Sequence, residues 1–589
     1  MDIRRRTVFQ GAGVAALAAF GIAEGAGTAL ADGSSGAAAG ASGQDALEFD
    51  SAAWSYDSTN DVYYQIGAAY AANPAATDYE NLSIYVPGAY LTASLNSDGS
   101  TYTARLSQKG TVGAYSARTA PIVVPVNTPG YSAQSPATSY SYSAVAQYLE
   151  AGFIYVWPGM RGTSSSTSTL TGDAPWGVTD LKAAIRYLRY NRSVLPGSTD
   201  DIYLFGMSGG GAQDTVAGSS GDSALYFPYL RAIGAAMEDA HGRPLSDAVA
   251  GVMAWCPITS LHEANLSYEW NMGQFASTDT RAAGTWTSAY STDLANAWAK
   301  YVNRLGLRDE HGRRLELAES SSGVYLAGSY YEYVISVITT SLNDFLVDTA
   351  FPYTYTQSSF GPPPSGGSTT PPSTSSTSTT FQTVEDYIAY LNTDTTWVTY
   401  DSATNTVEVL DLGGFVNSQK NASKPVGAFD GYSREQTENG VFGMGLNAPS
   451  HFAPLTRDVI AANQAKYAAY SDWDSSYGAA AYDSDFAQRD DAGKDVAWRV
   501  DAYNPLYYLS PAFGGYRQSQ VAPHWRIRTG IMQGDTANTT EINVLLALQN
   551  YGIRNVDFAT VWALPHTEAE RTGDPTTNFI DWVESIVTK

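Results

Sequence analysis

Short apolar segments alternate with an amphipathic one in the first part of the chain. Ile122–Val126, Phe153–Trp157 and Ile202–Phe205 are rich in β-branched or aromatic residues and are bounded by Gly or Pro, which is typical of buried strands. Between the last two, Val178–Tyr190 carries apolar residues at helical spacing. The order strand, helix, strand predicts a parallel sheet.

The same alternation returns after residue 500. Trp525–Thr529 and Val556–Val561 are expected as strands, and Glu541–Asn550 is expected as the helix between them. The two halves of the pattern are far apart in the sequence, so the predicted sheet is interrupted by a long insertion.

Residues 258–508 are interpreted as a lid inserted into an α/β domain, and an independent domain with no role in the chemistry is the alternative. They contain helical patterns such as Leu294–Arg304 and Tyr330–Ala350. From Gly361 to Thr380 every residue is Gly, Pro, Ser or Thr, a composition that favours a disordered loop. The expected organisation is a signal peptide in 1–31, a flexible segment in 32–60, the first part of the α/β core in 61–257, the lid in 258–508 and the second part of the core in 509–589.

The N-terminus has the pattern of an export signal. Arg4-Arg5-Arg6 precedes an Ala/Gly-rich, mildly apolar run from Gly11 to Leu30, and Ala29-Leu30-Ala31 offers small residues for a signal peptidase. This order predicts a twin-arginine signal, with the mature protein secreted or held at the cell envelope. An ordinary N-terminal helix is the alternative.

Composition narrows the classes of partner. Lys and Arg number 33 against 58 Asp and Glu, giving a formal net charge of −25, and such a surface repels nucleic-acid phosphates and anionic lipid. Beyond the N-terminus no run of about 20 apolar residues predicts a membrane span. The single cysteine, Cys256, excludes an intrachain disulfide and a thiolate metal cluster. We expect a soluble mature chain that needs no metal or organic cofactor and binds a small molecule.

A candidate nucleophile follows the strand that ends at Phe205. Gly206-Met207-Ser208-Gly209-Gly210 has the G-x-S-x-G form of a nucleophile elbow, and the next residues can open a helix. Small residues flank the serine because the sharp turn leaves no room for larger ones. The bare pattern arises often by chance in a chain this rich in Gly and Ser. Its position between a strand and a helix is what places Ser208 where an α/β-hydrolase has its nucleophile.

A serine nucleophile needs a base, and the chain has six histidines. His566 follows the last predicted strand and lies after the serine in the order that this type of sheet requires, so it is the expected base. His241 and His311 lie in turn-like, solvated contexts. His524 precedes a strand, at the wrong edge of the sheet, and His262 and His451 are possible lid contacts.

Two backbone amides are expected to form the oxyanion hole. One is the N–H of Gly209, directly after the nucleophile, and the other lies in the loop that follows Ile122–Val126. Within that loop, Asn127–Tyr131, Gly130 is the best candidate. A plain Pro-Gly turn without a catalytic role is the alternative.

Several segments together resemble the bacterial serine-esterase type (subtype B) of tannase, the tannin acyl hydrolases. The similarity extends over most of the chain from about residue 60, apart from the Ser/Thr/Pro loop. It implies an α/β-hydrolase fold with a large inserted lid domain. The segments that carry it are Ala151–Gly162, Asp180–Arg189, the elbow, Cys256–Thr259, Tyr268–Trp270 and Trp525–Arg528.

The resemblance also implies a site for the three phenolic hydroxyls of a galloyl group. Lys424 and Glu438 match the lid lysine and glutamate of that family in order and spacing, and Asp535 matches its substrate-binding aspartate. Carboxylates accept hydrogen bonds from phenols, and an ammonium donates to phenol oxygens. Without the resemblance, Lys424 and Glu438 would be interpreted as a solvated pair in a loop.

One position departs from the family pattern. The family carries Asp-x-Asp-Thr at the triad acid, whereas this chain has Gln533-Gly534-Asp535-Thr536. Gln533 can accept a hydrogen bond from His566 but brings no charge, and a comparable Asp-to-Asn change in serine proteases costs about 10⁴ in turnover. Three outcomes are open: Asp535 serves as the acid, another carboxylate such as Glu568 or Asp574 replaces it, or the protein binds more than it cleaves.

The leading interpretation is an exported serine carboxylesterase that hydrolyses galloyl or related polyphenol esters, with activity that Gln533 reduces. A feruloyl-type or other esterase of the same fold is one alternative. A weakly catalytic polyphenol-binding protein is the other. The natural ester and the oligomeric state remain open.

Overall fold

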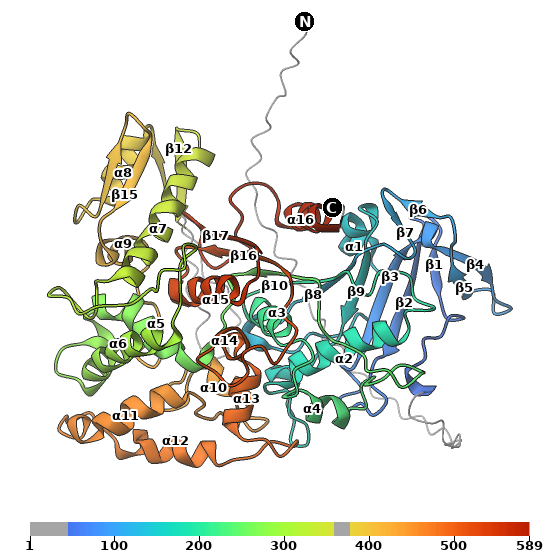
Figure 1. The fold of residues 1–589 in the computed structure, drawn as a ribbon, viewed down its shortest axis with the longest axis horizontal. Helices are drawn as coiled ribbons and strands as arrows, with labels where there is room; N and C mark the ends of the chain where they lie inside the picture. The colour runs from blue at the N-terminus through green and yellow to red at the C-terminus, as the bar shows by residue number, and fades with distance from the viewer. Residues whose placement is uncertain (1–44, 358–376, 588–589) are drawn as a thin grey trace, which may run out of the picture. The chain divides into compact units, whose positions relative to one another are not determined.

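A computed structural model describes residues 45–357 and 377–587. Its centre is a nine-stranded sheet in the order β1-β2-β3-β9-β8-β10-β11-β16-β17 (Figure 1). The predicted signal peptide, residues 1–31, lies outside the described residues. The segment 32–60, expected to be flexible, needs a correction, because Trp54 is buried and the next residues form β1 of this sheet. The strands of the sheet are β1 (Ser55–Asp57), β2 (Val62–Ala69), β3 (Asn81–Pro87), β8 (Ile122–Val126), β9 (Ile154–Pro158), β10 (Ile202–Met207), β11 (Gly251–Trp255), β16 (His524–Gly530) and β17 (Asn555–Val561).

The six strands from β9 to β17 in this order run parallel, and β1, β2 and β3 pair antiparallel at one edge. All residues of β8 and β11 are buried, which explains why these strands are uninterrupted apolar runs. Every strand predicted from the sequence is present, with ends that differ by at most two residues. Because the six strands are parallel, their carboxyl ends share one edge of the sheet.

Helices cover both faces of the parallel strands. On one face the ring of Phe205 packs against Tyr148 and Phe579, from the first and last helices of the core. On the other face Gly218 approaches Val252 so closely that an added Cβ would lie 2.4 Å from that side chain. The helices are α1 (Tyr142–Glu150), α2 (Trp176–Tyr190), α3 (Gly209–Ser219), α4 (Phe227–Ala232), α15 (Asn538–Tyr551) and α16 (Pro575–Val587), and short hairpins are formed by β4 (Leu91–Leu95) with β5 (Tyr102–Leu106) and by β6 (Thr111–Val112) with β7 (Tyr115–Ser116).

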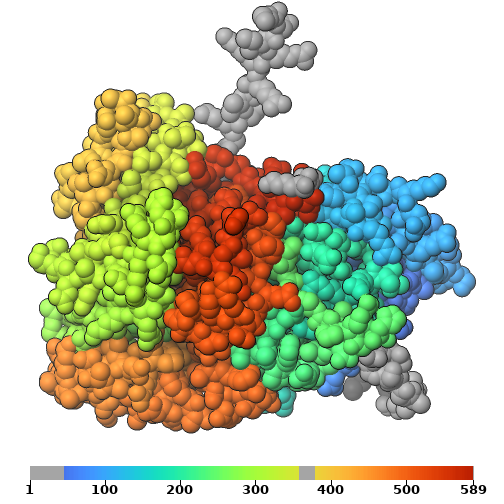
Figure 2. Space-filling view, in the orientation of Figure 1, coloured from blue at the N-terminus to red at the C-terminus, as the bar shows by residue number. Residues whose placement is uncertain are grey.

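The insertion lies between β11 and β16, which are neighbours in the sheet. It is mainly helical, and on the face drawn in Figure 2 the carboxyl-terminal residues, in red, lie between it and the amino-terminal part of the core. Its role as a lid stays a prediction. Its elements are α5 (Ala264–Asn271), α6 (Trp286–Leu305), α7 (Ser329–Asp348), β12 (Tyr353–Gln357), β13 (Thr377–Phe381), α8 (Val384–Leu391), β14 (Val398–Asp401), β15 (Thr406–Val409), α9 (Leu412–Gln419), α10 (Thr437–Val441), α11 (Pro454–Tyr467), α12 (Ala479–Phe486), α13 (Val496–Ala502) and α14 (Pro505–Leu509).

The expected loop from Gly361 to Thr380 needs a correction at its end. Residues 361–376 lie outside the described residues, but Thr377–Phe381 is a strand that pairs with Tyr353–Gln357. Hydroxyls also pair across this hairpin, with Thr354 2.9 Å from Thr380. Composition misled here because β-branched threonine suits a strand once a partner edge is available.

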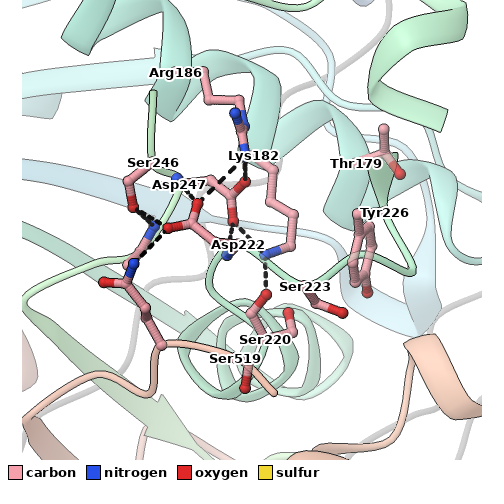
Figure 3. A network of polar contacts seen from close by, with 12 residues as sticks. Thr179, Lys182, Arg186, Ser220, Asp222, Ser223, Tyr226, Ser246, Asp247 and Ser519 are labelled. Atoms are coloured by element: carbon pink, nitrogen blue, oxygen red, sulfur yellow. Dashed lines mark hydrogen bonds and ion pairs between the residues drawn. The ribbon is translucent and has the colours of Figure 1, made fainter. Parts of the chain in front are cut away.

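A buried polar cluster fixes the helices to the sheet at the end away from the carboxyl edge. The carboxylate of Asp247 accepts from Lys182 Nζ at 2.8 Å and from Arg186 Nε at 2.7 Å, both from α2 (Figure 3). Arg186 also reaches Asp222 at 3.3 Å, and Lys182 donates to the carbonyl of Ser220. Two cations and two carboxylates therefore neutralise one another inside the core.

Within the described ranges, no helix is both long and apolar enough to cross a bilayer.

Candidate active site

Ser208 stands on a strained turn between β10 and α3. Its φ and ψ are 61° and −122°, a conformation that non-glycine residues rarely adopt. A Cβ on Gly210 would lie 2.0 Å from the carbonyl oxygen of Val126, and one on Gly206 would lie 2.5 Å from the same atom. The glycines around the serine are therefore required by the close approach of the turn to β8, as the nucleophile-elbow interpretation expects.

The loop predicted for the oxyanion hole lies against the serine turn. An added Cβ on Gly209 would come within 2.5 Å of the carbonyl oxygen of Thr128 and 2.6 Å of the amide nitrogen of Tyr131. Tyr131 N–H already donates to that Thr128 carbonyl, at 2.9 Å. Gly130, with φ of 57°, lies between the two. The structure thus brings the Gly209 and Gly130 segments together, and their role as oxyanion donors stays a prediction.

The serine turn and the segment of His566 are joined through Cys256. Ser208 N–H donates to the carbonyl of Trp255 at 3.0 Å, and the Cys256 thiol donates to the carbonyl of Thr567 at 3.1 Å. Gly530, at the end of β16, donates to the same sulfur. The ends of β10, β11 and β16 and the segment after β17 therefore meet at the carboxyl edge of the sheet, and direct contact between Ser208 and His566 stays a prediction.

The imidazole of His566 is held by the residue that departs from the family pattern. Its Nδ1 lies 2.7 Å from Gln533 Oε1. Asp535 Oδ2 lies farther away, at 3.9 Å from the same nitrogen. Of the other candidate carboxylates, Asp574 accepts from Thr577 at the start of α16, and Glu568 is exposed. The amide of Gln533 is thus the nearest partner of the expected base.

Burial and three neighbouring charges set the protonation of His566. Burial lowers the pKa of His566, and the cations of Lys424 and Lys420 lower it further, whereas the carboxylate of Asp535 raises it. The net shift is downward from the ordinary value. A neutral imidazole, which is the form that accepts a proton, therefore persists to a lower pH than in an exposed histidine.

Two buried charged residues that sequence reasoning missed stand behind Gln533. Gln533 Nε2 donates to Glu541 Oε1 at 2.8 Å, and Lys420 Nζ donates to the backbone carbonyl of Gln533. Glu541, in the first turn of α15, has no exposed surface. A signal was present: Glu541 shares a helical face with Leu545 and Leu548, where a carboxylate is out of place in an apolar stripe.

Lys424 and Glu438, predicted to bind substrate, form a pair in the insertion. Lys424 Nζ lies 3.5 Å from Glu438 Oε1 and 4.0 Å from the centre of the Phe429 ring. The other oxygen of Glu438 is buried and has no hydrogen-bond partner among the described residues. The solvated-pair alternative is wrong, because these side chains are only 13% and 5% exposed.

Tyr268 of α5 joins this pair to the loop of Gln533. Its hydroxyl accepts from the backbone N–H groups of Ser423 and Lys424 and donates to the carbonyl of Gly534, each at 2.9 Å. Arg281, which forms a buried ion pair with Glu269, donates to the carbonyl of Lys424. The backbone around Lys424 is therefore fixed relative to residues 533–535, and Lys424, Asp535 and His566 share one site.

The remaining histidines lie elsewhere. His241 and His311 are exposed in turns, as expected. His524 is the first residue of β16, at the opposite edge of the sheet from Ser208. In the insertion, His262 lies 2.7 Å from the hydroxyl of Tyr301, and His451 lies 2.7 Å from Asp430.

Comparison with known proteins supports the same fold and chemistry. The family model BD-FAE, an esterase family, matches residues 112–288. A tannin acyl hydrolase solved in complex with ethyl gallate is 26% identical, with a TM-score of 0.63, and the match covers 93% of this chain and 100% of that one. Tannase from Lactobacillus plantarum is also 26% identical, with a TM-score of 0.62 over 92% of this chain and 100% of that one. No match was found among curated proteins.

Tannase from Fusobacterium nucleatum, 24% identical, has a TM-score of 0.62 over 89% of this chain and 95% of that one, and this likeness supports the fold alone. The expected α/β-hydrolase fold and the expected resemblance to bacterial tannases are confirmed. The chain is therefore similar in fold to bacterial tannases over most of its length, and the family model that matches its residues 112–288 is of an esterase family.

Proposed function

We propose that this protein is an exported serine carboxylesterase that hydrolyses galloyl esters. The observation that carries the proposal is the gathering of Lys424, Glu438 and Asp535 beside His566. Phenolic hydroxyls would satisfy the unpartnered oxygen of Glu438, and the carboxylate of Asp535 offers a second acceptor. Esters without those hydroxyls would leave buried polar groups unpaired, and the site would disfavour them.

The reaction follows the geometry of the carboxyl edge. Ser208 Oγ attacks the ester carbonyl, and Nε2 of His566 takes the proton and returns it to the leaving alcohol. The amides of Gly209 and Gly130 stabilise the oxyanion. Water then attacks the acyl-enzyme, with His566 again as base, and releases the carboxylic acid.

The release of gallic acid from methyl gallate, compared with the hydrolysis of methyl benzoate and methyl ferulate, tests the proposal. We expect kcat/KM for methyl gallate to exceed that for methyl benzoate by about 100-fold, because only the gallate ester satisfies the polar set. Ser208→Ala should lower turnover by about 10⁴-fold or more. A preference for the ferulate ester would instead support the feruloyl-type alternative.

The absence of charge on Gln533 favours a second candidate, a polyphenol-binding protein that barely cleaves. Its signature would be binding of methyl gallate, measured by calorimetry, together with the same low turnover in the wild type and in Ser208→Ala.

Export is tested separately. Residues 1–40 fused to a reporter should carry it out of the cytoplasm, and a reporter that stays inside would contradict the twin-arginine prediction.

A further inference from the structure

A chain of two hydrogen bonds links the expected base to a carboxylate that does not touch it. His566 Nδ1 lies 2.7 Å from Gln533 Oε1, and Gln533 Nε2 lies 2.8 Å from Glu541 Oε1. Gln533 and Glu541 are 1% and 0% exposed. Water therefore does not reach the Gln533 amide, because Glu541 covers its nitrogen end and the imidazole of His566 covers its oxygen end.

The two ends of an amide side chain differ, so this chain of hydrogen bonds has a direction. One end of the Gln533 side chain donates and the other accepts, whereas an ionised carboxylate only accepts. In its ionised form, which the charge of the buried Lys420 favours, Glu541 requires the NH₂ group on its own side, and this turns Oε1 of Gln533 toward His566. A carbonyl oxygen beside Nδ1 requires a proton on Nδ1, and this leaves the lone pair on Nε2, the nitrogen that must accept the proton of Ser208.

The opposite orientation of the amide would disable the base. With the NH₂ group toward His566, Nδ1 must act as an acceptor, and the neutral imidazole then carries its proton on Nε2. Such a tautomer cannot accept the serine proton. A glutamine at the triad position therefore works only if a neighbour fixes its orientation.

We propose that Glu541 is a positioning residue, which orients the Gln533 amide and through it selects the tautomer of His566 that serves as base. This inference rests on the proposed use of Ser208 and His566 in ester hydrolysis. It also accounts for a triad without an acid in direct contact: the negative charge lies one amide farther from the imidazole.

Lys420 supports this arrangement from the other side. It is 1% exposed, donates to the backbone carbonyl of Gln533, and places a positive charge near Glu541. Burial raises the pKa of Glu541 and lowers the pKa of Lys420, while each charge opposes the shift of the other. The thiol of Cys256 and the carboxylate of Asp535 are the other titratable groups acting on this pair, and the Cys256 thiol is neutral because burial raises its pKa to about 12.

The first test replaces Glu541 with the isosteric amide. Glu541→Gln keeps the volume but no longer forces the Gln533 orientation. We expect kcat on p-nitrophenyl acetate, per site titrated with a fluorophosphonate, to fall at least about tenfold at unchanged KM. Glu263→Gln is the matched control, because Glu263 is a buried carboxylate of the insertion whose oxygens contact neither Gln533 nor His566.

The second test exchanges the two side chains. In Gln533→Glu/Glu541→Gln the carboxylate faces His566 directly, the amide donates to it, and Lys420 keeps its counter-charge. We expect kcat per titrated site to recover at least tenfold over the Glu541→Gln single variant. Titration of active sites separates a loss of folded enzyme, which lowers only the number of sites, from a loss of function in each site.

Two results would overturn the inference. One is a Glu541→Gln variant with wild-type kcat per site, and the other is an exchange variant that recovers less than tenfold. Because p-nitrophenyl acetate carries no phenolic hydroxyl, the outcome does not depend on galloyl specificity. An enzyme that cleaves this ester but no gallate ester would contradict the proposed substrate and leave the test of Glu541 valid.

Discussion

The hydroxyl of Tyr268 accepts a hydrogen bond from the backbone N–H of Lys424 at 2.9 Å, and the same oxygen donates to the loop that carries Gln533. One buried phenol therefore sets the distance between the backbone around Lys424, in the insertion, and the loop of Gln533, in the core. All three hydrogen-bonding capacities of the hydroxyl are used, which makes it sensitive to substitution.

Removing this hydroxyl should weaken substrate binding more than it slows the chemical step. Tyr268→Phe leaves the N–H groups of Ser423 and Lys424 without their acceptor, at a cost of about 1–3 kcal/mol, whereas the Gly534 carbonyl keeps the hydroxyl of Ser423. We expect KM for methyl gallate to rise several-fold and kcat on p-nitrophenyl acetate to change little. The control is Tyr90→Phe, which removes a buried hydroxyl bonded to Gly152. Equal effects in both variants would contradict the role of Tyr268.

Lys424 should determine preference for phenolic esters. Lys424→Met removes the cation that faces Glu438, and we expect kcat/KM for methyl gallate to fall about 100-fold while that for methyl benzoate is retained. Steady-state kinetics on both esters measure the ratio. Lys466→Met, which breaks a more exposed pair with Asp293, is the control. A parallel loss on both esters would show that Lys424 does not read the hydroxyls.

The pH dependence of kcat/KM should respond in opposite directions to the charges of Lys424 and Asp535. The neutral imidazole is the active base, so activity is lost as pH falls through the pKa of His566. Lys424 lowers this pKa and Asp535 raises it. The acid limb should therefore move to higher pH in Lys424→Met and to lower pH in Asp535→Asn, measured on p-nitrophenyl acetate. Shifts of the same sign would contradict the arrangement.

The buried cluster of Asp247 should govern stability rather than catalysis. Asp247→Asn leaves Lys182 without its carboxylate partner and Arg186 with Asp222 alone, and an uncompensated buried charge of this kind costs about 3–5 kcal/mol. We expect a clear drop in the urea midpoint followed by tryptophan fluorescence, with kcat per active site retained. Asp239→Asn, at an exposed pair with Arg243, should leave the midpoint unchanged.

Sequence reasoning located the strands because they are local features of the chain, whereas Gln533 was placed beside His566 by the resemblance to bacterial tannases. Ile122–Val126 is buried on both faces, and such strands are continuous apolar runs with sharp ends. Gln533 and His566 each follow a strand of a parallel sheet, so their meeting follows from topology.

Other parts depend on tertiary contacts that composition does not encode. Thr377–Phe381 gains strand structure only from its pairing with Tyr353–Gln357. The support that Glu541 and Lys420 give Gln533 joins α15 to the end of α9, more than a hundred positions away, and single polar residues in apolar surroundings carry no partner information. Tyr268 lies in a segment that the resemblance singled out, but nothing in the sequence indicated that its hydroxyl joins the backbone around Lys424 to the loop of Gln533.

The interrupted sheet has a consequence for when activity can arise during synthesis. The proposed nucleophile and both proposed oxyanion segments are translated before residue 256, whereas Gln533 and the proposed base, His566, follow the last two strands. A nascent chain whose residues 524–566 have not yet left the ribosome therefore has Ser208 without its proposed base. Under the proposed mechanism, hydrolytic competence is acquired only at the end of translation, when β16 docks beside β11 and β17 beside β16.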